Sequence, residues 1–453
     1  MHLRRVIVSI LVSTAAIPWS TASLAQNAPA ATAPALPPVG EQGAPPAPPA
    51  APEAPRAPTP PATFLGSADW KFGFHGLAGV SVYVQDTPGI VLNGQGPLLV
   101  LNKPAYGYTT GADIRQSRFN FSLAGPKAFG ATPKAVLEVD LFGLNSPGGF
   151  GEVSAYARVR LAYAELNWGN AVLRFGQDYQ LVLGLLPESI GHMAFPVTYF
   201  NGMLGWREPG VGYFHTFPME GSKLELAVQL MKSDWRNPTD FGMPTTNDLN
   251  VDYGQLSGWL GVEGRAKWTS EHVTAFVAGH YNRVEATHAG SLVVPPMMVP
   301  GRDWDVVAGV AGVKVTLGDL TLAGSAYVGK NLAPLLGELL QFVQTTDVSE
   351  WGAWAQVGYN VTKNLNLSIV GGGSQLSTSD VEAAAAGGGG VRLYSDVLGG
   401  MVRYQDAGFA VGPEFYHIWT KSINAAGNDV PSGAGAPGEL NANQFMLSGM
   451  YFF

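Results

Sequence analysis

Residues 155–180 read AYARVRLAYAELNWGNAVLRFGQDYQ, and this stretch decides the fold. Val159, Leu161 and Tyr163 alternate with other residues, which is the period-2 pattern of a β-strand with one apolar face. The turn-like segment Trp168-Gly169-Asn170 follows, and a second alternating run begins directly after it. Each run has about ten residues or more, which is the length that a tilted strand needs to cross a bilayer. The stretch therefore predicts a hairpin of two membrane-spanning strands.

The same alternation recurs along the chain from residue 69 to the end. We expect an all-β fold, a transmembrane antiparallel β-barrel of about 16 strands with short periplasmic turns and long extracellular loops. The joints predict this more strongly than the strands, because short and long joints alternate strictly and a soluble sandwich has no reason to sort its loops by parity. The expected strands are 69–84, 112–125, 133–144, 155–168, 170–180, 203–217, 221–233, 253–268, 271–285, 303–317, 319–331, 350–362, 364–376, 393–406, 408–421 and 442–453.

The composition is typical of such a barrel. The 453 residues include 58 Gly and no Cys, and only 13% of them are charged although 11% are aromatic. No apolar run reaches the roughly 18 residues that a membrane-spanning helix requires. The net charge of −8 argues against nucleic acid as a partner. The lack of Cys excludes thiolate metal sites, the eight His residues are scattered, and we expect no metal and no cofactor.

The chain begins with a segment that predicts export. Residues 1–25 combine a basic start, a short apolar stretch and small residues before a cleavage point, so we expect a signal peptide. Residues 26–63 are rich in Pro and Ala and predict an extended periplasmic linker without a core. This linker is either a disordered tail or a spacer that reaches the peptidoglycan. The barrel is expected over residues 64–453.

Three short runs resemble a known family. Ser117-Arg118-Phe119-Asn120-Phe121, residues 157–166 and Leu173-Arg174-Phe175-Gly176-Gln177 resemble the early-strand signature of trimeric outer-membrane porins, nearest the DcaP-like porins. The resemblance implies sixteen strands, a homotrimer and a loop after the fifth strand that folds into the lumen. The Pro/Ala-rich residues 26–63 depart from it, because DcaP-like members carry a helical coiled-coil extension there.

Lumen-facing charges are the candidate functional residues. By alternation, arginines of the early strands point inward together with acidic residues, and such a set produces a transverse field that favours small anions if the guanidiniums dominate. The alternative is that these side chains only pair with one another. Arg115 has the opposite parity to Arg118 and faces inward only across a bulge, so it is left out. The expected constriction residues are Arg118, Arg158, Arg160, Arg174, Glu138, Asp140, Asp178, Glu188 and His192.

The loop 181–202 is unusually apolar, since it begins with Leu181-Val182-Leu183-Gly184-Leu185-Leu186. An exposed loop of this composition would be a sticky patch, so we expect it to fold into the barrel. Glu188 and His192 then face the pore opposite the arginines. His192 is either a pH-dependent charge or, as we favour, an ordinary hydrogen-bonded histidine.

The last strand has an apolar face that ends at the terminal residue. Tyr451 and Phe453 occupy alternate positions there, and they resemble the signal that the barrel-assembly machinery recognises in Gram-negative bacteria.

These observations predict a homotrimeric porin of the bacterial outer membrane, in contact with outer-membrane lipid. It is expected to be a channel for passive diffusion of small hydrophilic solutes, favouring small anions such as dicarboxylates, and not an enzyme. One alternative is a phospholipase-like barrel enzyme, for which His280 and Asn282 share a strand face. The others are a transporter of hydrophobic compounds and a structural anchor to the cell wall.

Overall fold

The computed structural model describes most of the chain after residue 70. The chain divides into two units, Met1–Ala54 and Pro55–Phe453. All described residues belong to the second unit. The expected signal peptide (1–25) lies outside the described residues, and so does the expected linker (26–63) apart from residue 63. The described residues are 63–65, 70–86, 94–96, 98–100, 107–143, 146–147, 153–233, 253–285, 302–339, 341, 343, 345–387, 391–424, 427–428 and 438–453.

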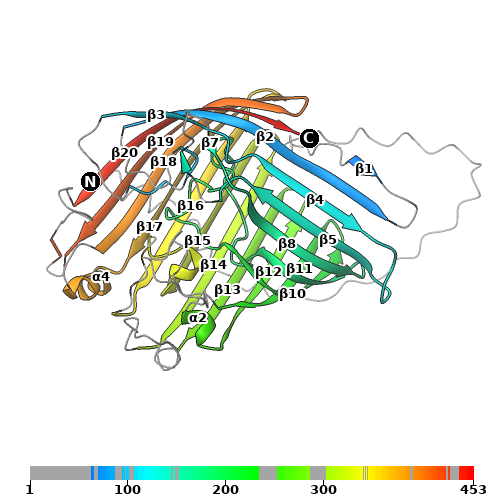
Figure 1. Ribbon diagram of the computed structural model, residues 1–453, viewed down its shortest axis with the longest axis horizontal. Coiled ribbons are helices and arrows are strands. Elements are labelled where there is room, and N and C mark those ends of the chain that lie inside the picture. The colour runs from blue at the N-terminus through cyan, green and yellow to red at the C-terminus, as the bar shows by residue number, and fades with distance from the viewer. Residues whose placement is uncertain are drawn as a thin grey trace, which may run out of the picture. The chain divides into compact units, whose positions relative to one another are not determined.

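Sixteen strand positions form one closed antiparallel β-barrel, which confirms the expected fold class (Figure 1). Each strand pairs with its neighbours in chain order, and β3 and β4 share one position. The wall consists of β2 (Lys71–Gln85), β3 (Thr109–Asp113), β4 (Arg118–Ala124), β5 (Thr132–Asp140), β8 (Arg158–Asn167), β9 (Ala171–Tyr179), β10 (Arg207–Met219), β11 (Ser222–Lys232), β12 (Leu260–Ser270), β13 (Val273–Val284), β14 (Trp304–Leu317), β15 (Leu320–Lys330), β16 (Ser349–Asn360), β17 (Leu365–Leu376), β18 (Val391–Asp406), β19 (Phe409–Ile423) and β20 (Glu439–Phe452).

The barrel closes where its first and last strands meet. Leu77 of β2 lies opposite Phe452 of β20 on one edge and opposite Arg118 of β4 on the other. The backbones of Gly76 and Phe453 exchange two hydrogen bonds, with N···O distances of 2.9 and 3.1 Å. The Phe453 ring also packs against other outward-facing aromatic rings of β2 and β4. The structure thus places Phe453 at the seam, while its role as an assembly signal stays a prediction.

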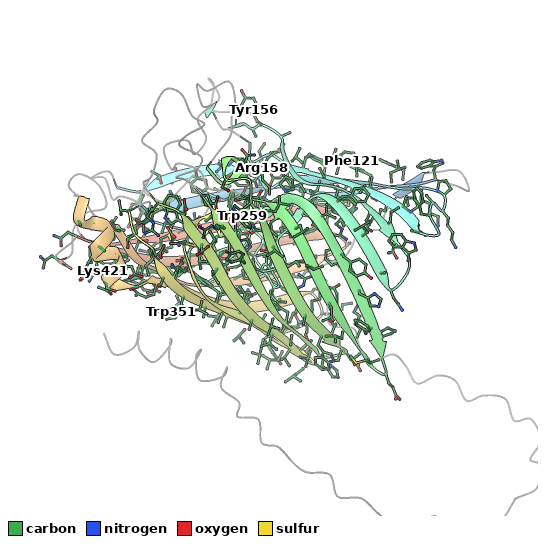
Figure 2. The ribbon with its side chains drawn as sticks, turned by 90° about the horizontal axis from the view of Figure 1, so that it is seen from below. Phe121, Tyr156, Arg158, Trp259, Trp351 and Lys421 are labelled. Atoms are coloured by element: carbon green, nitrogen blue, oxygen red, sulfur yellow. The ribbon has the colours of Figure 1, made fainter. Side chains whose placement is uncertain are left out.

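Side chains alternate between the two faces of the wall as the period-2 pattern predicts. In β2, Val80 and Val82 are 40% and 53% exposed, whereas Ser81 between them is fully buried. Apolar side chains cover the outside of the barrel, where Phe121 and Trp351 are labelled in Figure 2. A barrel in lipid needs this distribution, because its outer side chains contact hydrocarbon while the backbone hydrogen bonds are all satisfied between strands.

Several connections are tight turns. Two residues separate β10 from β11, β14 from β15 and β18 from β19. Gly318 and Gly408 lie in two of these turns with φ of 59° and 89°, where a side chain would be strained. Longer connections include residues 180–206 between β9 and β10, and residues 331–348 between β15 and β16.

Two expected strands differ from the structure. The strand expected over 112–125 is interrupted at residues 114–117, so that β3 and β4 are separate. This break turns Arg115 inward, where its guanidinium is buried and pairs with Asp113. The strand expected over 253–268 begins only at Leu260, because a short helix precedes it.

The remaining elements are short. No helix among the described residues is both long enough and apolar enough to cross a bilayer. The remaining elements are β1 (Thr63–Leu65), which pairs with β2, the hairpin of β6 (Ser146–Pro147) and β7 (Val153–Ser154), α2 (Tyr253–Leu256), α4 (Thr378–Ala384), η2 (Ala333–Leu335) and η3 (Ala385–Gly387).

Candidate pore constriction

The connection between β9 and β10, residues 180–206, lies inside the barrel, and we call it the inserted loop. Its Val182 and Leu204 are buried in one apolar cluster with Phe276 of β13 and Trp304 of β14. Packing against the inner wall removes this apolar surface from water, which is why a loop of such composition is stable here. The expectation that the loop folds inward therefore agrees with the structure.

One buried carboxylate of β19 holds the middle of the inserted loop. Glu414 is 1% exposed and accepts hydrogen bonds from the Ser189 hydroxyl at 2.9 and 3.0 Å. It also accepts from the backbone N–H of Ile190 at 2.6 Å and of Gly191 at 3.2 Å. The Tyr416 hydroxyl donates a further bond at 3.1 Å. Four donors thus satisfy the carboxylate, and they fix the loop to this strand.

Two glutamines hold the loop on either side of that point. The Gln356 amide of β16 accepts from the Glu188 N–H at 2.7 Å and donates to the Glu188 carbonyl at 2.8 Å. Gln116, in the break between β3 and β4, accepts from the Ala194 N–H at 2.9 Å and donates to the Gly191 carbonyl. A side-chain amide that pairs with the backbone in both directions substitutes for a strand partner, so the loop has a defined position.

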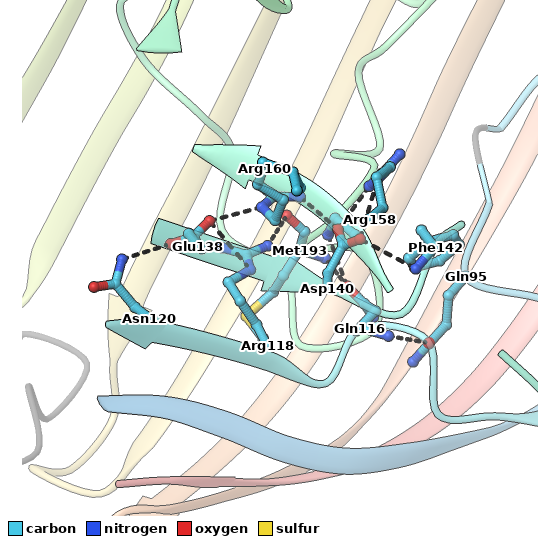
Figure 3. Close-up of polar contacts among 12 residues, drawn as sticks. Gln95, Gln116, Arg118, Asn120, Glu138, Asp140, Phe142, Arg158, Arg160 and Met193 are labelled. Carbon is cyan, nitrogen blue, oxygen red and sulfur yellow. Dashed lines mark hydrogen bonds and ion pairs between the residues drawn. The ribbon is translucent and has the colours of Figure 1, made fainter. Parts of the chain in front are cut away.

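Five of the expected constriction residues meet on the inner faces of β4, β5 and β8 (Figure 3). We call them the arginine cluster: Arg118, Arg158, Arg160, Glu138 and Asp140. The guanidinium of Arg158 binds both oxygens of Asp140, at 3.0 and 2.6 Å. Arg160 bridges the two acids, with 2.7 Å to Glu138 and 2.9 Å to Asp140. Arg118 lies 3.6 Å from Glu138.

Burial divides the arginine cluster into an inner and an outer part. The side chains of Arg160 and Asp140 are 2% and 0% exposed. Those of Arg118 and Arg158 retain 18% and 21%. The inner pair therefore holds its neighbours in place, whereas the outer arginines keep part of their surface accessible. The pairing drawn from the sequence is thus present in this cluster, whereas the transverse field stays a prediction.

The inserted loop covers this cluster with aromatic rings. The Arg158 guanidinium lies 4.9 Å from the Phe195 ring centre and 5.4 Å from that of Trp206. Arg118 donates a hydrogen bond to the Met193 carbonyl at 3.2 Å. Arginine stacks well on aromatic faces because its planar guanidinium is weakly hydrated. The loop thus holds the exposed arginines in fixed orientations.

Arg174 of β9 belongs to a separate group on β8 and β9. Its guanidinium binds Glu165 at 2.7 Å and also pairs with Asp178, and it stacks on the Tyr163 ring at 4.2 Å. The alternation of Val159 and Leu161 with the arginines of β8 predicts that Tyr163 faces outward, which is wrong. A bulge makes Arg160 an extra residue opposite β5, and the parity of β8 is reversed beyond it.

The Glu188 side chain extends toward the side of the barrel opposite the arginine cluster. Its carboxylate is 3.1 Å from Arg403 of β18 and 3.7 Å from Lys314 of β14. The side chain is 43% exposed. Glu188 is therefore an accessible lumen group, and it offsets one of two cations on that wall.

His192 is packed into the wall. It is 1% exposed, its Nε2 is 2.8 Å from the Gln444 amide oxygen, and its ring meets Tyr416 edge to face. Burial lowers the pKa of His192 below its ordinary value, so the ring is neutral at pH 7. This arrangement favours the hydrogen-bonded histidine over the pH-dependent pore charge.

Sequence reasoning missed Arg207, the first residue of β10. It is 5% exposed, and its guanidinium stacks on Trp206 at 3.9 Å and lies 5.5 Å from the Tyr179 ring. Among the described residues, no hydrogen bond or ion pair satisfies this guanidinium. Arg207 has the same parity as the outward-facing Val211 and Tyr213, so the alternation along the strand predicts that its side chain faces outward. The sequence pattern therefore gave no signal of its burial.

With Arg207, the site carries four guanidiniums against the two carboxylates of the arginine cluster. These six side chains therefore carry a net positive charge. No group of three or more His, Asp or Glu side chains suited to a metal ion occurs in the described part of the chain.

Comparisons with known proteins concern the fold. No protein-family model and no curated protein matches the sequence. The chain is similar in structure to the outer membrane channel DcaP of Acinetobacter baumannii, with a TM-score of 0.62 and 15% identity over 86% of this chain and 100% of that one. It is also similar to Salmonella typhi OmpF, with a TM-score of 0.54 and 13% identity over 86% and 100% of the chains.

The anion-selective porin from Comamonas acidovorans is a third similar structure, with a TM-score of 0.51 and 12% identity over 85% of this chain and 100% of that one. The fold is thus that of outer-membrane porins, as the resemblance of the early strands implies.

Proposed function

We propose that this protein is a porin of the bacterial outer membrane, a channel for passive diffusion of small hydrophilic solutes. Three observations support the proposal: the apolar outer belt, the closed sixteen-position barrel and the likeness in fold to outer-membrane channels. Sixteen strands enclose more space than their own side chains fill, and the inserted loop narrows that space. Solutes cross down their gradients beside the loop, so no chemical step and no cofactor are needed.

The channel favours small anions such as dicarboxylates. Arg207 carries this part of the proposal, because it is a buried guanidinium that no carboxylate of the described residues neutralises. An anion that passes the arginine cluster gains an interaction that a cation lacks. The outer arginines, Arg118 and Arg158, add to the same field.

The proposed assembly is a homotrimer in outer-membrane lipid. The terminal residues Phe453 and Tyr451 serve as the signal for the barrel-assembly machinery, and residues 26–63 form a periplasmic linker that reaches toward the peptidoglycan. The resemblance to trimeric porins supports the trimer, and the position of Phe453 at the barrel seam supports the assembly signal. The linker rests on the Pro/Ala-rich composition of residues 26–63.

The experiment is conductance in a planar bilayer with a salt gradient, comparing the wild type with Arg207→Gln. We expect stepwise conductance in threes and a reversal potential on the anion side. For an ion that passes at about 10 Å, removal of one charge changes the ion's energy by about 0.4 kcal/mol in water, so we expect Arg207→Gln to lower anion preference roughly twofold. A cation-side reversal overturns the anion preference, and folded protein without conductance overturns the porin.

The structure does not favour the phospholipase-like alternative. His280 is 6% exposed and faces the barrel interior, where its Nδ1 is 2.8 Å from Glu263. Asn282 donates to the Ser233 hydroxyl at 2.9 Å on the same side. A lipase site needs these groups at the lipid interface. Phospholipid hydrolysis by the purified barrel is the measurement that would revive this alternative.

A further inference from the structure

A second loop packs against the end of the inserted loop that precedes β10. Between β15 and β16, we call the described residues 331–339, 341, 343 and 345–348 the latch loop. Its Leu335 carbonyl accepts a hydrogen bond from the Gly205 N–H at 2.8 Å. Leu335 shares an apolar cluster with Leu204, and Leu339 shares another with Tyr199. The end of the inserted loop that carries Trp206 therefore rests on the latch loop.

Two carboxyl groups are buried side by side, one in the latch loop and one in β16. Glu338 is 0% exposed and Glu350 of β16 is 2% exposed. Glu350 accepts hydrogen bonds from the Glu338 backbone N–H at 2.6 Å and from the Tyr327 hydroxyl at 2.5 Å. Glu338 accepts one from the Val343 N–H at 3.3 Å. Its Oε1 is buried without a hydrogen-bond partner among the described residues.

The charges around Glu338 do not neutralise it. Among the described residues, neither Glu338 nor Glu350 forms an ion pair. Asp347 of the same loop is already paired with Arg302 and Lys330. The remaining titratable groups that pack nearby are Tyr327 of β15, Tyr199 of the inserted loop, and Arg392 of β18, which donates to the Leu339 carbonyl at 2.7 Å. A buried carboxylate without a cation is unstable, so Glu338 is held in its neutral form.

The backbone of the latch loop is strained at the same place. Asn331, Leu336, Glu338 and Leu339 have φ of 57°, 60°, 52° and 52°, in the left-handed region that residues with a Cβ seldom adopt. Such strain persists only while surrounding contacts enforce the conformation. The buried side chains of the loop provide those contacts.

We propose that Glu338 is a positioning residue that makes the seating of the inserted loop depend on pH. A neutral Glu338 keeps the latch loop folded beneath the inserted loop. Ionisation of Glu338 places a buried negative charge beside the Glu350 carboxyl group without a cation to offset it, so the strained latch loop opens and the inserted loop loses its support near Gly205. This device lies outside the arginine cluster and stands whether or not the barrel conducts.

The direction of the pH dependence follows from burial. Burial and the neighbouring Glu350 raise the pKa of Glu338 well above its ordinary value. A group with a raised pKa in the folded loop stabilises that loop fully below the ordinary value. This stability is lost as pH rises toward the folded pKa. Release of the Glu338 proton alone raises the ratio of open to closed loop about tenfold per pH unit in this window.

The test is hydrogen–deuterium exchange of the folded full-length barrel between pH 5 and pH 9. Glu338→Gln keeps the shape of the side chain and removes the titration of residue 338. The ratio of wild-type to variant exchange at each pH therefore cancels the pH dependence of the intrinsic exchange rate. We expect this ratio to rise with pH both for peptides covering 331–339 and for peptides covering 199–206. Glu271→Gln, at an exposed turn glutamate, is the matched control and should behave as wild type.

Two results would overturn the proposal. One is a wild-type ratio that is flat across the pH range, and the other is a rise confined to 331–339 without 199–206. If Glu338→Gln does not fold, the wild-type profile of 331–339 relative to the turn at 361–364 decides in the same way. Exchange needs no conductance, so failure of the porin proposal and failure of this one are separate results.

Discussion

The inserted loop is held between two walls of different chemistry. The arginine wall, formed by β4, β5 and β8, meets it with charged groups, of which Asp140 binds two guanidiniums. The anchor wall, formed by β16 and β19, meets it with Gln356 and a single carboxylate, Glu414, that accepts only from neutral donors. The arginine wall contains a positive excess, whereas the anchor wall satisfies its partners one by one. We therefore expect the arginine wall to set the electric field and the anchor wall to set the position of the loop.

The largest effect is expected from Asp140→Asn on the arginine wall. The substitution leaves Arg158 and Arg160 without their shared buried carboxylate, and breaking a buried ion pair costs about 3–5 kcal/mol. Urea unfolding of the barrel in detergent measures this loss. Asp319→Asn, at an exposed turn, should stay within about 0.5 kcal/mol of wild type. An Asp140→Asn barrel as stable as wild type would show that the arginine wall does not depend on this charge.

A smaller effect is expected from Gln356→Ala on the anchor wall. The Glu188 N–H and carbonyl lose both of their side-chain partners, which costs about 1–3 kcal/mol. Because the loop loses an anchor and no charge changes, we expect noisier open-channel current with unchanged ion selectivity. Gln405→Ala is the matched control, since the Gln405 Nε2 has no hydrogen-bond partner among the described residues. A shift in selectivity with Gln356→Ala would contradict the division of roles between the walls.

The smallest effect on stability, and a clear one on selectivity, is expected from Glu188→Gln. The Glu188 ion pairs with Arg403 and Lys314 are partly exposed, and such pairs contribute at most about 1 kcal/mol. Without the carboxylate both cations face the lumen unpaired, so anion preference rises about twofold. The reversal potential in a salt gradient measures it, with Glu188→Asp as the charge-preserving control. An unchanged reversal potential would place Glu188 outside the ion path, and a fall in anion preference would contradict the electrostatic argument.

The sequence predicted the barrel well because alternation and turn length are local properties. The pairing of Arg118 with Glu138 was also predictable, since their strands are neighbours and their parities match. The interruption at 114–117 and the bulge at Arg160 were not predictable, because one residue out of register leaves the alternation on either side intact. These irregularities turned Arg115 and Tyr163 inward.

Arg207 and Glu414 were missed for a different reason. Their roles depend on where the inserted loop runs, and a loop without periodicity gives no register from which contacts can be predicted. In β19, Val411, Pro413 and Phe415 alternate with Glu414 and face outward. The alternation therefore predicts that Glu414 faces inward, but it does not predict which groups Glu414 binds. Whether the expected residues line an ion path stays a prediction that the conductance experiments test.

The seam between β2 and β20 has a consequence for how the chain is made. Ser81 and Ser448, whose hydroxyls meet at 2.6 Å across it, are 367 residues apart in sequence. The first strand to leave the ribosome therefore waits with an open edge until the last strand has been synthesised and exported. Contacts of such sequence separation form slowly, and unpaired edges aggregate in the interval. A truncated chain that lacks β20 cannot close the barrel against β2, so folding of this protein requires the complete chain.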